Sequence, residues 1–167
     1  GVGAEQDDGY LNQSADSGAV RFYSFSDSSF SGGTLESTIG YKYTGGKNID
    51  LAPGWIADIS ERFSSVALDG ARAIIGGHRD ASMHVPTGGS VVMTTFADSV
   101  FSGGLIQGLA GNGYSNGKGI SYDPAFYSTP DNYAYSVSLN ANRLAVSALN
   151  DDGQNNDINN AGAVYLY

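Results

Sequence analysis

The sequence GAVRFYSFSDSSFSGG at residues 18–33 returns as GSVVMTTFADSVFSGG at residues 89–104. Nine of the 16 positions are identical, and the two stretches lie 71 residues apart (89 minus 18). The same offset continues through the pairs Gly40/Gly111, Tyr43/Tyr114, Lys47/Lys118 and Arg72/Arg143. A constant offset over this length indicates an internal duplication, which decides how the rest of the chain is interpreted.

A third, partial copy connects the two ends of the chain. Residues 2–23 align without gaps on residues 146–167, at an offset of 144 (146 minus 2). The chain therefore begins and ends at the same phase of its repeat. We interpret residues 1–17 as the end of a preceding unit, 18–88 and 89–161 as two repeats, and 162–167 as the first strand of a following unit.

Each repeat, about 72 residues long, predicts four short strands. Residues 63–68 and 135–139 alternate apolar with small polar side chains, which is the period of a strand. Asp69-Gly70 and Asn140-Ala141-Asn142 follow them directly, as in tight hairpins. The other expected strands are residues 20–25, 35–43, 73–76, 90–96, 105–109, 144–148 and 163–167. No stretch has sustained helical spacing, so the sequence predicts an all-β fold: two four-stranded antiparallel propeller-blade-like repeats plus a duplicated edge segment.

Composition and charge exclude several classes of protein. The chain has 17 Asp and Glu against 8 Lys and Arg, a net charge of −9, and no Cys. Such a surface repels nucleic-acid phosphates and anionic lipid. The lack of Cys excludes a disulfide framework, a thiolate zinc site and a cysteine nucleophile. No apolar run approaches the roughly 20 residues of a membrane span, and the first residues have no features of a signal peptide. We therefore expect neither a nucleic-acid partner nor a membrane span.

Several stretches resemble FG-GAP-type repeats. They are FSSVALDG at residues 63–70, AIIGG at 73–77, LAVSALNDDG at 144–153 and GAVYLY at 162–167. FSDSSFSGGTL at residues 25–35 and YTGGKNI at 43–49 are similar to tandem repeats of large, filamentous-haemagglutinin-like bacterial surface adhesins. The resemblance implies propeller-type blades and an extracellular or cell-surface location. The family's Gly-Ala-Pro and Phe-Gly elements appear here as Gly76-Gly77-His78 and Phe63-Ser64.

Two acidic loops are the best candidates for a metal site. One carries Asp7, Asp8, Asn12 and Asp16, and the other carries Asp151, Asp152, Asn155 and Asp157. Calcium takes six to eight oxygen ligands, which clustered Asp and Asn on a Gly-bearing turn supply, and the resemblance adds that FG-GAP-like loops often bind calcium. Asp, Asn and Gly also build solvated turns without any metal. Both interpretations stay open, and no other cofactor is expected.

Aromatic residues gather in the long segments before the third strands. They are Trp55, Tyr122, Phe126, Tyr127 and Tyr133. Exposed on loops, they would stack on sugar rings or anchor a protein partner; packed inside, they would seal the gap between neighbouring units. The two histidines, His78 and His84, lack the third ligand of a transition-metal site, and we expect them to be exposed loop residues.

The functional hypothesis rests on the strand edges that two blades alone would leave unpaired. Two blades cannot close a propeller, which typically needs four to eight, and unpaired strand edges invite further pairing. We expect an extracellular structural or adhesive repeat protein that self-associates through sheet edges and repeat interfaces into a ring or filament, or that neighbours other repeats of a longer chain. The alternative is a carbohydrate- or receptor-binding module that uses the aromatic loops. No nucleophile or acid–base pair is arranged as in an enzyme, so no catalytic activity is expected.

Overall fold

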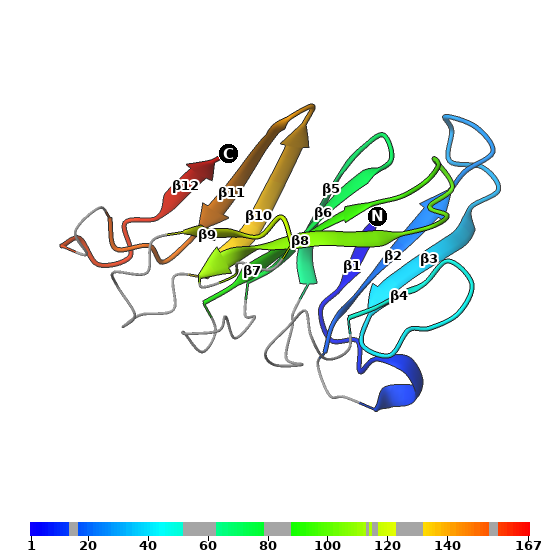
Figure 1. Cartoon of the computed structure of the whole chain (residues 1–167), viewed down its shortest axis with the longest axis horizontal. Helices are drawn as coiled ribbons and strands as arrows, with labels where there is room; N and C mark the ends of the chain where they lie inside the picture. Colours follow the sequence, from blue (N-terminus) through cyan, green and yellow to red (C-terminus); the bar gives the residue numbers. More distant parts are fainter. Residues whose placement is uncertain are drawn as a thin grey trace.

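The computed structural model describes residues 1–13, 17–51, 63–78, 88–112, 114, 117–122, 132–153 and 157–167, without the side chains of residues 64, 112, 121 and 122. In these parts of the chain the strands form three sheets (Figure 1). The N-terminal sheet has the order β1 (Val2–Ala4), β2 (Ala19–Ser24), β3 (Thr34–Gly40), β4 (Ile49–Asp50). The middle sheet has the order β5 (Phe63–Asp69), β6 (Arg72–Gly77), β7 (Ser90–Thr95), β8 (Leu105–Asn112), β9 (Ile120–Tyr122). The C-terminal sheet consists of β10 (Tyr133–Asn140), β11 (Arg143–Ala148) and β12 (Ala163–Leu166).

The all-β prediction is confirmed, with all nine expected strands in place. The only helical element of the described residues is a single 3-10 turn at Tyr10–Asn12, and none of them belongs to a helix long and apolar enough to cross a membrane. The expected hairpins join β5 to β6 and β10 to β11. The short strands β1, β4 and β9 were not expected, and β4 and β9 pair in parallel with β3 and β8. Within the described residues, each repeat therefore adds one short strand that pairs in parallel, β4 or β9, to the four expected antiparallel strands.

The hydrogen-bonded sheets are out of phase with the sequence repeats. The middle sheet takes β5 and β6 from the first repeat and β7 to β9 from the second. By their sequence offsets, β1 to β4 of the N-terminal sheet are equivalent to β6 to β9 of the middle sheet. The strands β10 to β12 of the C-terminal sheet are equivalent to β5 to β7 of the middle sheet. The strand register follows the 144-residue offset, because Ala4 pairs with Ala19 as Ala148 pairs with Ala163. The duplicated edge segment thus forms two equivalent strand pairs, β1 with β2 in the N-terminal sheet and β11 with β12 in the C-terminal sheet.

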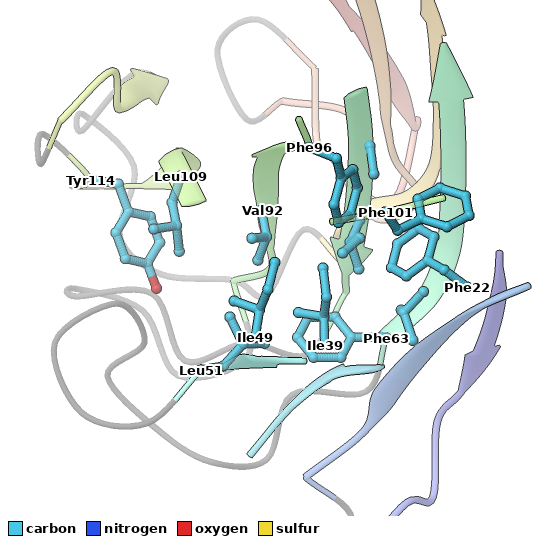
Figure 2. Packing of buried hydrophobic residues seen from close by; sticks show 13 residues of the cluster. Phe22, Ile39, Ile49, Leu51, Phe63, Val92, Phe96, Phe101, Leu109 and Tyr114 are labelled. Carbon is cyan, nitrogen blue, oxygen red and sulfur yellow. The ribbon is translucent and has the colours of Figure 1, made fainter. Parts of the chain in front are cut away.

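Two separate hydrophobic clusters hold the three sheets together. One lies between the N-terminal and middle sheets, where Phe22 meets Phe96 and Phe101 (Figure 2). The other lies between the middle and C-terminal sheets. Successive residues of β7, Val91 and Val92, belong to different clusters. Since both faces of the middle sheet are covered, its central strands β6 and β7 carry short continuous apolar runs, at residues 73–75 and 91–93, instead of alternating ones.

One glycine fixes the distance between the middle and C-terminal sheets. Gly89, just before β7, has a φ of 88°, and a Cβ atom built there would lie 2.0 Å from the backbone oxygen of Tyr133. No other residue fits both the left-handed backbone and this close approach. Gly89, the first residue of the second duplicated stretch, is therefore required for the close packing of the middle and C-terminal sheets.

Candidate interaction surfaces

The duplicated sequence folds into two loops of the same structure. We call residues 25–33, which follow β2, the first aromatic loop, and residues 96–104, which follow β7, the second. In the first, the Asp27 carboxylate accepts hydrogen bonds from the N–H groups of Ser29 and Ser31 at 2.8 and 3.1 Å. In the second, Asp98 accepts them from Val100 and Ser102 at 3.0 and 2.9 Å. The duplication in sequence is therefore a duplication in detailed geometry.

These hydrogen bonds also change the acidity of the two carboxyl groups. The bond from the backbone of Ser31 contributes most to lowering the pKa of Asp27, and the bond from the backbone of Ser102 contributes most to lowering that of Asp98. Each loop then places a phenylalanine, Phe30 or Phe101, in left-handed backbone with a φ of 62° or 59°. The charged form of the aspartate thus favours the folded loop.

Each aromatic loop presents a pair of phenylalanine rings. The centroids of Phe25 and Phe30 lie 5.2 Å apart with an interplanar angle of 86°, and those of Phe96 and Phe101 lie 5.1 Å apart at 81°. In the second loop the ring of Phe22 lies 5.4 Å from Phe96 and 5.0 Å from Phe101, and all three rings are buried. In the first loop Phe25 and Phe30 are 46% and 74% exposed. The two loops differ in their neighbours and not in their fold.

The C-terminal sheet ends the stack with an uncovered apolar face. Val164 and Leu166 in β12 are 65% and 79% exposed. The 144-residue offset places them on Val20 and Phe22 of β2, which are fully buried against the middle sheet. Large apolar side chains exposed together on one sheet face indicate an interaction surface. Among the described residues β12 also pairs only with β11, whereas the equivalent β7 has a neighbour on both edges.

A hollow adjoins this face. It has a volume of about 540 Å³ and is lined by residues that include Arg143, Ala145 and Leu166. A second hollow, of about 390 Å³, includes Arg72, Ile74 and Met93, which hold the same positions one unit earlier. The C-terminal sheet closes one side of the second hollow with Leu139 and Tyr167. The first hollow thus occupies the position on the C-terminal sheet that the second hollow occupies on the middle sheet. The second hollow lies between two sheets, whereas no described sheet covers the first.

The N-terminal sheet carries a charged network on the face turned away from the middle sheet. Arg21 holds the position that Val92 holds in β7, and its Nη2 atom lies 2.5 Å from Oδ2 of Asp7. The hydroxyl of Tyr43 donates to Oδ1 of Asp7 at 2.9 Å. Burial, then the hydrogen bond to Asp7 and its charge, raise the pKa of Tyr43. This end of the stack is therefore more polar than the C-terminal end.

The two acidic loops are built on aspartates that close tight turns. Asp7 accepts a hydrogen bond from the N–H of Gly9 at 3.0 Å, and Asp151 accepts one from Gly153 at 2.8 Å. Tyr165, the equivalent of Arg21, donates to the second oxygen of Asp151 at 2.5 Å. Both carboxylates are therefore engaged by the protein itself, as the turn interpretation expects.

The remaining candidate ligands add no metal cluster that the structure describes. Asp152 accepts a hydrogen bond from the N–H of Asn160 at 2.7 Å, while Asn12 and Asp157 are exposed. Asp8 has interactions of its own. Asp16 and Asn155 lie outside the described residues. Within the described ranges no three His, Asp or Glu side chains are grouped as a metal site, so calcium binding stays a prediction.

The expected aromatic binding residues have different outcomes. Trp55, Phe126 and Tyr127 lie outside the described residues, and Tyr122 is described only as backbone in β9. Tyr133 begins β10 and is fully buried, with its ring 5.6 Å from Tyr165 and its hydroxyl donating to that of Tyr167 at 3.0 Å. It therefore has no exposed surface for a sugar or receptor, and its packing is that of a residue sealing two units.

His78 is not the exposed loop residue that we expected. It is buried, its ring lies 5.4 Å from that of Tyr135, and Nε2 lies 3.5 Å from Oε1 of Glu5. Its contacts come from Tyr135 in β10 and from Glu5 just after β1, and the sequence around His78 does not show these neighbours. His84 lies outside the described residues.

Sequence reasoning missed the residues that the structure brings forward. Phe25, Phe30 and Leu166 were part of the repeat pattern but were not singled out as a surface. The signal was present in the alignment, because both aromatic loops keep the same Phe spacing and Leu166 falls on Phe22. The alignment does not show which of the two equivalent loops or strands is covered by a neighbouring sheet.

The comparisons with known proteins agree with part of this picture. The family model of the FG-GAP repeat matches residues 127–167, which include the whole C-terminal sheet and its acidic loop. No curated protein and no solved structure matches the chain. The likeness to filamentous-haemagglutinin-like adhesins stays a prediction. FG-GAP repeats are typical of extracellular or surface proteins and are generally non-enzymatic, so the match suggests an extracellular repeat or adhesion-type domain.

Proposed function

We propose that the chain is a structural or adhesive repeat module at the cell surface or outside the cell, and that copies of it associate into a ring or filament. The FG-GAP match and the three stacked sheets support the repeat character. Contacts that are not self-complementary close into a ring or extend as a filament, depending on the rotation between copies. Neighbouring repeats of a longer chain would use the same surfaces.

The exposed position of Leu166 carries this proposal. Its counterpart Phe22 is completely buried by the next sheet, and so is Val20, the counterpart of Val164. Full burial of a valine or leucine side chain contributes about 1.5–3 kcal/mol. Part of this is offset by the entropy lost on association. We therefore expect a weak, concentration-dependent association that grows by sheet-on-sheet packing.

Sedimentation velocity tests this association. The wild-type chain is measured from about 10 μM to about 1 mM, a range that brackets weak dissociation constants, beside Leu166→Glu and a control, Leu105→Glu. Leu105 in β8 is 63% exposed but belongs to the middle sheet, whose two faces are already covered. We expect larger species for the wild type and the control, and a monomer for Leu166→Glu. A monomeric wild type over the whole range would disprove the proposal.

Carbohydrate binding is the second candidate, and the 390 Å³ hollow supports it. Its lining combines apolar side chains with Arg72, Lys118 and Arg143, an arrangement suited to an acidic sugar. Titration calorimetry with acidic oligosaccharides tests this function. Heat of binding that disappears in an Arg143→Ala variant would support it, and the absence of heat would contradict it.

A further inference from the structure

We infer that the uncovered face of the C-terminal sheet of one copy docks on the first aromatic loop of a second copy, with Leu166 against the Phe25–Phe30 pair. The inference rests on the proposed self-association and names the surface that receives it. It also fixes the direction of assembly as head to tail, because the two surfaces are different.

The template for this contact exists within each chain. Phe22 of the N-terminal sheet packs against both Phe96 and Phe101 of the second aromatic loop (Figure 2). Leu166 is the repeat-equivalent of Phe22, and Phe25 with Phe30 is the repeat-equivalent of the Phe96–Phe101 pair. Within one chain, the middle sheet packs on the N-terminal sheet. If a second copy packs on the C-terminal sheet in the same way, its exposed Phe25–Phe30 pair lies against Leu166.

The first aromatic loop is already in the conformation that holds a partner. Its two rings are 5.2 Å apart, against 5.1 Å in the occupied loop, and Phe30 keeps the same left-handed backbone as Phe101. The hydrogen bonds to Asp27 maintain this shape without a neighbour. A surface that needs no rearrangement loses less free energy on binding.

The hollow beside Leu166 offers space for the incoming rings. It holds about 540 Å³ and is lined by the small side chains of Ser138 and Ala145 as well as by Leu166. Arg143 also lines it, and the incoming loop carries Asp27. In the internal interface a cation contacts the corresponding loop, since Nζ of Lys47 donates to the backbone oxygen of Val100 at 2.8 Å. We expect the cationic Arg143 and the carboxylate of Asp27 to add an attraction between opposite charges to the apolar contact.

A single chain cannot make this contact with itself. The first aromatic loop follows β2 of the N-terminal sheet and Leu166 lies in β12 of the C-terminal sheet, and these two sheets lie at opposite ends of the described structure with the middle sheet between them (Figure 1). The occupant that offers both surfaces in matching phase is a second copy. The contact leaves the same two surfaces free at the ends of the dimer, so assembly continues.

Complementary variants test the inference. The tail variant is Leu166→Glu, and the head variant is Phe25→Ser with Phe30→Asn, where Asn tolerates the left-handed backbone. Circular dichroism and thermal melting confirm that each is folded, and Phe30→Asn alone replaces the head variant if the double substitution is not. We expect each variant alone to lose association at least about tenfold. An equimolar mixture should form a one-to-one dimer and nothing larger, because only one intact pair of surfaces remains.

The outcomes separate this inference from the proposed function. If the wild type assembles and the head variant assembles equally well, the Phe pair is not the receiving surface and the inference fails. A folded mixture that stays monomeric also overturns it. Loss of association in the tail variant alone would indicate that two C-terminal sheets pair face to face, which again overturns the head-to-tail contact. A wild type that is monomeric throughout disproves the proposed function itself.

Discussion

Leu166 in β12 holds the position that Phe22 holds in β2, yet Phe22 is completely buried and Leu166 is 79% exposed. The two residues hold equivalent positions in equivalent strands, so the difference in exposure comes from the neighbouring sheet. The middle sheet covers Phe22, and within the chain nothing that the structure describes covers Leu166.

Replacing Gly89 by Ala should destabilise the chain strongly. The new Cβ would lie 2.0 Å from the backbone oxygen of Tyr133, at a φ of 88°, so the two sheets must move apart. We expect a loss of about 3 kcal/mol or more in the free energy of unfolding, measured with urea. Gly70→Ala is the control, because its φ of 57° is also left-handed but nothing lies within 4 Å. It should cost about 1–2 kcal/mol, and equal losses would contradict the role of the close approach.

Acid should weaken the aromatic loops through Asp27 and Asp98. Hydrogen bonds from backbone N–H groups lower the pKa of both carboxyl groups in the folded state. Their contribution to stability is therefore complete above the unfolded value of about 3.9 and is lost as the pH falls through the folded pKa. Melting temperatures of Asp98→Ala should lie below those of the wild type at neutral pH. The difference should shrink as the pH falls below about 4, and a constant difference would contradict this linkage.

Asp151 should support its turn without calcium. Replacing it by Ala removes the hydrogen bonds from Gly153 and Tyr165, which should cost about 1–3 kcal/mol because the donors are partly buried. Calorimetric melting of the wild type and Asp151→Ala, in excess calcium and in chelator, measures the effect. We expect the same loss in both buffers. A wild-type melting temperature that rises with calcium, and does so only while Asp151 is present, would restore the metal interpretation.

Thr94→Val should raise the stability of the middle sheet. The hydroxyl of Thr94 is buried and has no hydrogen-bond partner among the residues that the structure describes. An unsatisfied buried polar group costs about 1–3 kcal/mol, and valine has nearly the same shape without it. Urea unfolding should show a gain of up to about 1 kcal/mol for the variant. A loss of stability would mean that the hydroxyl does have a partner, such as a bound water.

Most of the fold could be predicted from the sequence, because the repeat is written in it. The Gly18 and Gly89 stretches gave the offset, and alternation gave β5 and β10 with their hairpins. The short strands β4 and β9 could not be predicted, since two or three residues carry no period. They exist because β3 and β8 leave an edge on which the returning chain pairs in parallel.

The candidate surfaces were less predictable, because exposure depends on neighbours and not on residue type. The burial of His78 arises from Tyr135 and Glu5, which lie in other parts of the chain. Tyr133 is buried in the cluster between the middle and C-terminal sheets, where its ring contacts Tyr165 of β12, and the sequence around residue 133 does not show these neighbours. Conversely, Phe25 and Phe30 have the sequence of a buried pair but are exposed, because no sheet among the described residues covers them as the N-terminal sheet covers Phe96 and Phe101.

The chemical reactivity of residue 166 provides a direct test of stacking between copies. The chain has no Cys, so a single Leu166→Cys substitution reports its own accessibility through its rate of reaction with a thiol-specific probe. If another copy covers the C-terminal sheet, that rate falls at least about tenfold as the protein concentration rises through the dissociation constant, while Leu105→Cys keeps a constant rate. Equal rates for the two variants at every concentration would contradict the claim that the stack continues from one copy to the next.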